Sequence, residues 1–125
     1  MKSGTAGEVV EILHRRYPPE TAQEWDRVGV ALGDLSGSAK RIYFAVDVLP
    51  ETVAEAIEWE ADFFISHHPL FLFELAEPAP GEEPLPMAPW KSQLAAQLEI
   101  SGAVLLTLHT NADVANPGVS DALAQ

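Results

Sequence analysis

The chain has 125 residues, 47% of them hydrophobic, which is enough for one compact core but too little for two ordinary domains. Nineteen acidic against seven basic residues give a formal charge of −12, which disfavours binding to nucleic acids and to anionic membrane surfaces. The absence of cysteine excludes disulfides, thiolate catalysis and sulfur-ligated metals. We therefore expect one domain over residues 1–125, in which any metal is bound by nitrogen or oxygen ligands.

The chain begins with the pattern of an amphipathic helix. Thr5 and Glu8 have the spacing of a capping box. The apolar residues that follow at helical spacing, and that we expect to face the core, are Val9, Ile12 and Leu13. Prolines at 18 and 19 stop the pattern. No run approaches the roughly 20 apolar residues of a membrane span, and the first residues lack the apolar stretch of a signal peptide, so we expect a cytoplasmic protein.

A strand–helix–strand unit is predicted next, after an irregular segment over residues 24–33 that leads into a short extended stretch. Residues 41–47 are β-branched and aromatic, as in a strand. Pro50 then opens a helix. The residues of this helix that we expect to face inward are Val53, Ala54 and Ile57. A second strand follows over residues 62–66.

The second half of the chain predicts a loop, a helix, a strand and a last helix. Five prolines and four glutamates crowd residues 74–89, so we expect a solvated loop there, whose functional interpretation is a lid. Helical spacing resumes through Leu94 and Leu98 and ends at Gly102. The apolar run 103–108 is typical of a strand buried on both faces. Pro117 precedes the start of another helix.

This order of elements predicts an α/β fold with a mostly parallel sheet and helices on both faces, because right-handed crossovers would join the strands. In such a sheet the C-terminal ends of the strands lie along one rim. Asp47, the His67-His68 pair and the segment 109–113 would therefore meet at that rim.

The metal-ligand candidates are His67, His68 and Asp113. Neighbouring residues on a strand point to opposite faces, but Pro69 lets the chain leave the sheet, so both imidazoles can share a cleft. Asp113 is expected to join them, since a carboxylate can bridge two cations. His109 is expected to be the catalytic group, orienting a ligand or substrate and assisting proton transfer rather than ligating directly.

Simpler interpretations compete with these roles. A histidine at a strand end is more often solvated or bonded to the backbone than bound to a metal. Asp47 is better interpreted as an N-cap or turn acceptor than as a ligand. Trp25 and Trp90 are better interpreted as packing residues than as walls of a site.

Three segments, in this order, resemble a known family. They are Glu24-Trp25-Asp26-Arg27-Val28-Gly29-Val30-Ala31-Leu32-Gly33, Ile65-Ser66-His67-His68-Pro69-Leu70-Phe71 and His109-Thr110-Asn111-Ala112-Asp113-Val114. From its first helix to its last residue the chain resembles the Nif-three-like dinuclear-metal family, whose members are often named GTP cyclohydrolase 1 type 2 homologues. One departure is Arg27, where the family usually has Asn, so a polar contact of that Asn is not predicted for this chain.

The resemblance implies a Nif-three-like α/β fold and a dinuclear site of divalent ions, zinc, iron or manganese, two per full-length subunit. It implies that His67, His68 and Asp113 are ligands and that subunits assemble as a hexameric ring. Family members take further ligands from a His and a Glu near the C-terminus of a chain about twice this length. This chain is therefore expected to be the N-terminal half, with an incomplete cage and reduced metal affinity.

Two functions are considered for such a metal-binding protein. The first is a metal-dependent hydrolase of an unidentified small molecule; the family name suggests GTP, although no Gly-rich phosphate loop or Walker pattern is present. The second is a non-catalytic scaffold that serves metal handling, regulation or partner docking. A third, simpler possibility is an inert α/β fragment whose histidines are surface polar residues.

Overall fold

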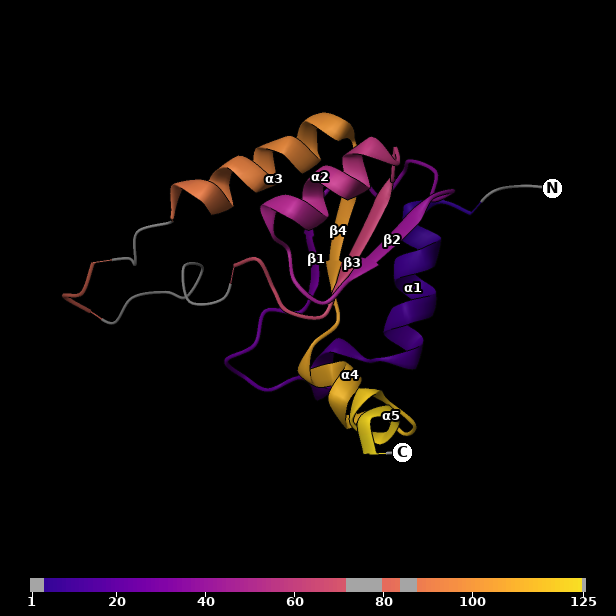
Figure 1. The fold of residues 1–125 in the computed structure, drawn as a ribbon. Helices are drawn as coiled ribbons and strands as arrows, with labels where there is room; N and C mark the ends of the chain where they lie inside the picture. Colours follow the sequence, from indigo (N-terminus) through magenta and orange to yellow (C-terminus); the bar gives the residue numbers. More distant parts are fainter. Residues whose placement is uncertain (1–3, 72–79, 84–87, 125) are drawn as a thin grey trace.

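The structure is a computed structural model, and it describes residues 4–71, 80–83 and 88–124. The elements in chain order are α1 (Ala6–Arg16), a short 3-10 helix η1 (Pro19–Thr21), β1 (Gly29–Leu32), β2 (Ile42–Ala45), α2 (Pro50–Glu58), β3 (Phe63–Ser66), α3 (Pro89–Ser101), β4 (Val104–Thr107), α4 (Thr110–Val114) and α5 (Val119–Ala124) (Figure 1). Most of the expected loop over residues 74–89, with its interpretation as a lid, lies outside the described residues. None of the described helices is long and apolar enough to cross a bilayer.

The four strands form one mixed sheet in the order β1-β4-β3-β2. β2 pairs parallel with β3, and β3 pairs parallel with β4, whereas β1 pairs antiparallel with β4. The prediction of a mostly parallel sheet is therefore wrong at β1. Crossover connections fix the relative direction only of strands joined through a helix, here β2–α2–β3 and β3–α3–β4. β1 enters the sheet before the first of these units, so nothing in that argument sets its direction.

The two central strands, β3 and β4, are buried along their whole length. Their side chains alternate between two apolar clusters, as the pleat of a strand requires. Phe64 and Leu105 pack with residues of α2 and α3, whereas Phe63 and Leu106 pack with residues of α1 and α4. Figure 1 shows α2 and α3 next to each other and apart from α1.

The helices begin and end close to where the sequence predicts, but two inward residues differ. The capping box of Thr5 and Glu8 is present at the start of α1, and Gly102 ends α3 in the left-handed conformation. Ile12 is 61% exposed, and Ala54 is exposed while Ala56 is buried. Helical spacing fixes which residues share a stripe, but the part of the stripe that meets the sheet depends on how the helix docks.

The N-terminal ends of the central strands are held by backbone contacts. Gly33 follows β1 with φ of +113°, and a Cβ at this position would lie 2.6 Å from the Cα of Val104. Asp62 precedes β3, and its carboxylate accepts hydrogen bonds from the backbone N–H groups of Lys40 and Arg41, both at 3.0 Å. These contacts fix where β1 and β2 begin or end beside the central strands.

Candidate metal centre

The candidate site lies where β3 and β4 end. His67 and His68 follow directly after β3, and their backbone N–H groups still donate to the carbonyl of Val46 beyond β2, at 3.2 and 2.8 Å. Beyond β4, the backbone N–H of Leu108 donates to the carbonyl of Ser66 at 3.0 Å, and His109 then forms the N-cap of α4. The C-terminal ends of the two parallel strands thus carry the three imidazoles to one place, as the sequence predicts.

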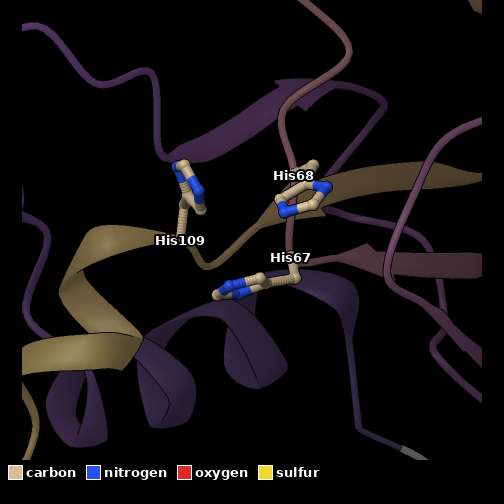
Figure 2. A group of neighbouring side chains, drawn as sticks. All are labelled: His67, His68 and His109. Carbon is tan, nitrogen blue, oxygen red and sulfur yellow. The ribbon is translucent and has the colours of Figure 1, made fainter. Parts of the chain in front are cut away.

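His67, His68 and His109 form a compact group. One ligand atom from each lies within 4.8 Å of the others, which makes this group able to hold a metal ion. The ring centroids are 5.0 Å apart for His67 and His109, 5.2 Å for His67 and His68, and 5.4 Å for His68 and His109. Figure 2 shows the three rings around a shared space. His109, which the sequence assigned to catalysis, is therefore close enough to ligate as well.

All three rings are held through the same atom, Nδ1, which donates to an oxygen. In the order His67, His68, His109 the acceptors are the Leu108 carbonyl at 2.8 Å, Asp47 Oδ1 at 2.6 Å and Asp26 Oδ1 at 3.1 Å. Within residues 4–71, 80–83 and 88–124, no hydrogen bond occupies the Nε2 of these rings. Metal-bound histidines typically donate their second ring N–H to a carboxylate or a carbonyl, so the site meets a requirement of metal ligation beyond proximity. Three imidazoles with a nearby carboxylate suit zinc and similar divalent ions.

Asp113 lies beside this group on α4. Its Oδ1 is 3.8 Å from Nε2 of His67, and its side chain is 35% exposed. One turn of α4 separates it from His109, whose carbonyl accepts a hydrogen bond from the Asp113 N–H at 3.1 Å. The structure therefore brings all four predicted residues to one rim. The ligand role of Asp113 and the catalytic role of His109 stay predictions.

Asp47 is a hydrogen-bond acceptor, as one of the two favoured interpretations has it, but it is not an N-cap. The N-cap of α2 is Leu49, and the carboxylate of Asp47 instead accepts the hydrogen bond from His68. Its backbone carbonyl accepts from the Thr52 hydroxyl at 2.9 Å. The interpretation of the side chain as an N-cap is wrong because the chain turns into α2 two residues later, which leaves the carboxylate facing the histidines.

Asp26 is a site residue that sequence reasoning missed. Its side chain has no exposed surface, and it accepts hydrogen bonds from the backbone of Arg27, from His109 and from both the backbone N–H and the hydroxyl of Thr110. Burial raises the pKa of Asp26, but the hydrogen bonds from Thr110 and His109 outweigh it, so the pKa lies below its ordinary value. A signal for this residue existed, since Asp26 is part of the first segment of the family resemblance.

The two tryptophans are also placed differently from the prediction. Trp25 is 52% exposed and Trp90 is 43% exposed, so neither is a core packing residue. The ring of Trp25 meets the ring of His109 edge to face, with centroids 6.2 Å apart. Trp25 thus forms one wall beside the histidines, because the loop that holds Asp26 runs past them.

An apolar hollow of about 460 Å³ opens beside His67. Its wall comes from α1, from the open side of β2 and from the chain that follows β4, with Leu13, Phe44 and Leu108 among the lining residues. Among the described residues that line it, none is a lysine or an arginine. A hollow of this size accommodates a small molecule.

Comparisons with known proteins give a consistent family. The family model described as Duf34/NIF3 (NGG1p interacting factor 3) matches residues 5–125. A Streptomyces coelicolor protein named GTP cyclohydrolase 1 type 2 homolog is 39% identical over 117 residues, which cover 94% of this chain and 39% of the relative. A Mycobacterium leprae protein of the same name is 39% identical over 122 residues, which cover 98% of this chain and 29% of the relative. The chain thus spans well under half of these curated relatives.

Solved structures match over nearly the whole chain. A Bacillus cereus protein related to NIF3 superposes with a TM-score of 0.82 at 29% identity, covering 99% of this chain and 32% of that one. Reduced HcgD from Methanocaldococcus jannaschii superposes with a TM-score of 0.80 at 28% identity, covering 96% of this chain and 45% of that one. The α/β fold described above is therefore the fold that these proteins have over the matched part.

Proposed function

Because the chain belongs to the Duf34/NIF3 family, as its three segments indicated, we propose that it binds divalent metal for the hydrolysis of a small molecule. The proposal rests on the hydrogen-bond pattern that the three imidazoles share. Each Nδ1 donates to an oxygen, no described residue forms a hydrogen bond with an Nε2 of these rings, and one ligand atom from each residue lies within 4.8 Å of the others. A solvated surface histidine has no need of such a partner.

The proposed ligands are the Nε2 atoms of His67, His68 and His109, with the carboxylate of Asp113 beside them. A bound divalent ion supplies Lewis acidity and a water that ionises near neutral pH. Asp113 offsets the positive charge at the site and is the residue we assign to the second of the two ions, whether zinc, iron or manganese. The proton-transfer role predicted for His109 and metal ligation would both use its Nε2. The orientation of the ring therefore does not distinguish the two roles, and an experiment is needed to do so.

The substrate class is proposed from the surroundings of the site. The hollow beside His67 has room for a small organic molecule, and the overall charge of −12 disfavours a polyanion. GTP is the first compound to test because the curated relatives carry the name GTP cyclohydrolase 1 type 2 homolog. The described lining of the hollow holds no lysine or arginine, so any phosphate group there would have to be bound by the metal ions rather than by basic side chains.

The test begins with metal content after purification without chelator, followed by turnover of GTP and simple phosphoesters with added manganese, zinc or iron. We expect metal-dependent turnover that is lost in His68→Ala and in Asp113→Ala. His14→Ala is the matched control, since His14 lies on α1 outside the three-histidine group. Stoichiometric metal without turnover would favour the scaffold function, and the absence of metal from a full-length version that includes the C-terminal His and Glu would remove both functions.

We also propose that the chain self-associates, with the hexameric ring implied by the family resemblance as the expected assembly. Support comes from β2, an edge strand on which Phe44 is 70% exposed, followed by Val46 at 58%. Exposed apolar residues along an open strand edge favour association with another chain. Light scattering over a range of concentrations tests this, and a monomer throughout that range would contradict it.

A further inference from the structure

We propose that Asp26 is a positioning residue for the metal site: its carboxylate holds His109 in the form protonated at Nδ1 and thereby directs the free Nε2 toward His67 and His68. This inference rests on the proposed metal-binding function and deepens it. It assigns a task to a residue that lies 83 positions before His109 in the chain and has no ligand role of its own.

The carboxylate of Asp26 is fixed at both oxygens. Oδ1 accepts from the Nδ1 of His109 at 3.1 Å and from the backbone N–H of Arg27 at 2.9 Å. Oδ2 accepts from the backbone N–H of Thr110 at 3.0 Å and from its hydroxyl at 2.6 Å. Rotation of the carboxylate would break several of these bonds in a place without solvent access, so the acceptor that faces His109 has one orientation.

The surroundings of His109 leave its ring dependent on that acceptor. The backbone N–H of His109 is anchored separately, because it donates to Oδ1 of Asn111 at 2.9 Å. The loop that holds Asp26 is tied to α4 by a second bond, from the backbone N–H of Gln23 to the Thr110 hydroxyl at 2.9 Å. The backbone of His109 is thus held in place without Asp26. The carboxylate of Asp26 fixes the rotation of the His109 ring and the nitrogen that carries its proton.

The three ring partners differ in how firmly they hold. Leu108 offers a backbone carbonyl to His67, and Asp47, whose side chain is 48% exposed, offers a carboxylate to His68. Asp26 alone combines a carboxylate with complete burial, where water does not compete and a charge-assisted bond is stronger. Substitution of Asp26 should therefore weaken metal binding more than the matching substitution of Asp47.

The first measurement is the tautomer of His109 in the metal-free chain, from long-range proton–nitrogen NMR correlations of the histidine side chains. We expect the proton on Nδ1. A proton on Nε2 overturns the proposal without any variant. Because no metal is present, this result is independent of the proposed metal-binding function, which fails separately if titrated zinc does not bind.

The second measurement is zinc affinity by calorimetry. We expect Asp26→Asn to bind zinc about 10- to 100-fold more weakly and to lose the Nδ1–H signal of His109, since loss of a group that orients a metal-bound histidine has effects of this size. Asp62→Asn is the matched control, because it makes the same chemical change at a carboxylate that accepts hydrogen bonds only from the backbone of Lys40 and Arg41, at the other end of the sheet. It should keep both the tautomer and the affinity. An unchanged affinity in Asp26→Asn, or an equal loss in Asp62→Asn, overturns the proposal; if Asp26→Asn does not fold, the tautomer of His109 in the unsubstituted chain decides.

Discussion

At their C-terminal ends β3 and β4 lead into three imidazoles, whereas at their N-terminal ends they meet a close backbone approach at Gly33 and a capping carboxylate at Asp62. Both ends use polar groups and tight contacts. At the C-terminal end the hydrogen bonds hold imidazoles through Nδ1, and at the N-terminal end the carboxylate of Asp62 uses both oxygens on the backbone N–H groups of Lys40 and Arg41, just before β2.

The difference indicates that one end of the sheet serves binding and the other serves stability. An imidazole that is hydrogen-bonded through one ring nitrogen can bind a ligand through the other. A carboxylate whose two oxygens both accept from backbone N–H groups has no unbonded oxygen for a ligand. Substitutions at the two ends should therefore have separable effects on metal affinity and on the free energy of unfolding.

The largest effect should come from His68→Ala. We expect zinc affinity to fall at least about 100-fold, because even the loss of a residue that only orients a ligand reduces affinity 10- to 100-fold. The free energy of unfolding should change by less than about 1 kcal/mol, since the side chain of His68 is 51% exposed. Calorimetric zinc titration and urea unfolding measure the two quantities, and an unchanged zinc affinity would contradict the division between the two ends.

Gly33→Ala should have the opposite profile. We expect a loss of about 2 to 3 kcal/mol in the free energy of unfolding, because the new Cβ meets the backbone of Val104 and the φ of +113° strains any side chain. Gly102→Ala is the matched control: its φ is +82° but no atom lies within 4 Å of the added Cβ, so about 1 kcal/mol is expected. Equal losses in both variants would show that conformation, not contact with β4, is responsible.

Asp47→Asn, at the C-terminal end of the strands, should lower zinc affinity again, but less than His68→Ala does. We expect zinc affinity to fall about tenfold, the lower end of the range for groups that orient a metal-bound histidine, because Asp47 is half exposed. Thermal unfolding of the metal-free protein should hardly change. A large drop in melting temperature without a change in affinity would place Asp47 among the stabilising residues instead.

Asp62→Asn should give the smallest effect, at the other end. The amide keeps one acceptor oxygen, so one of the two backbone N–H groups of Lys40 and Arg41 loses its partner and the other bond loses the charge on its acceptor; we expect a loss of about 1 kcal/mol in the free energy of unfolding. Zinc affinity should stay the same. Reduced zinc affinity in this variant would mean that the two ends of the sheet are coupled through β3, and it would contradict the division between a binding end and a stabilising end.

The parts of the fold that depend on local sequence could be predicted from it. The capping box of Thr5 and Glu8, the stop at Gly102 and the buried strand over residues 104–107 each involve neighbours in the chain. The convergence of His67, His68 and His109 was also predictable, because it follows from parallel strands that share one rim.

The rest depends on contacts between distant residues. The antiparallel direction of β1 is set by its pairing with β4, more than 70 residues later, and no turn signal records it. The bond between Asp26 and His109 is of the same kind: the family segment marks Asp26 as notable, but nothing in the sequence around it names His109 as its partner. The exposure of Ile12 reflects the docking angle of a helix, which its own spacing does not contain.

The bond from His67 to the Leu108 carbonyl has an evolutionary consequence. A single substitution at position 26 or 47 removes the carboxylate that holds His109 or His68, whereas every amino acid at position 108 still supplies a main-chain carbonyl oxygen. The orientation of His67 is thus insensitive to substitution at position 108. The orientations of His68 and His109 depend on the side chains of Asp47 and Asp26, so substitutions can change them more easily.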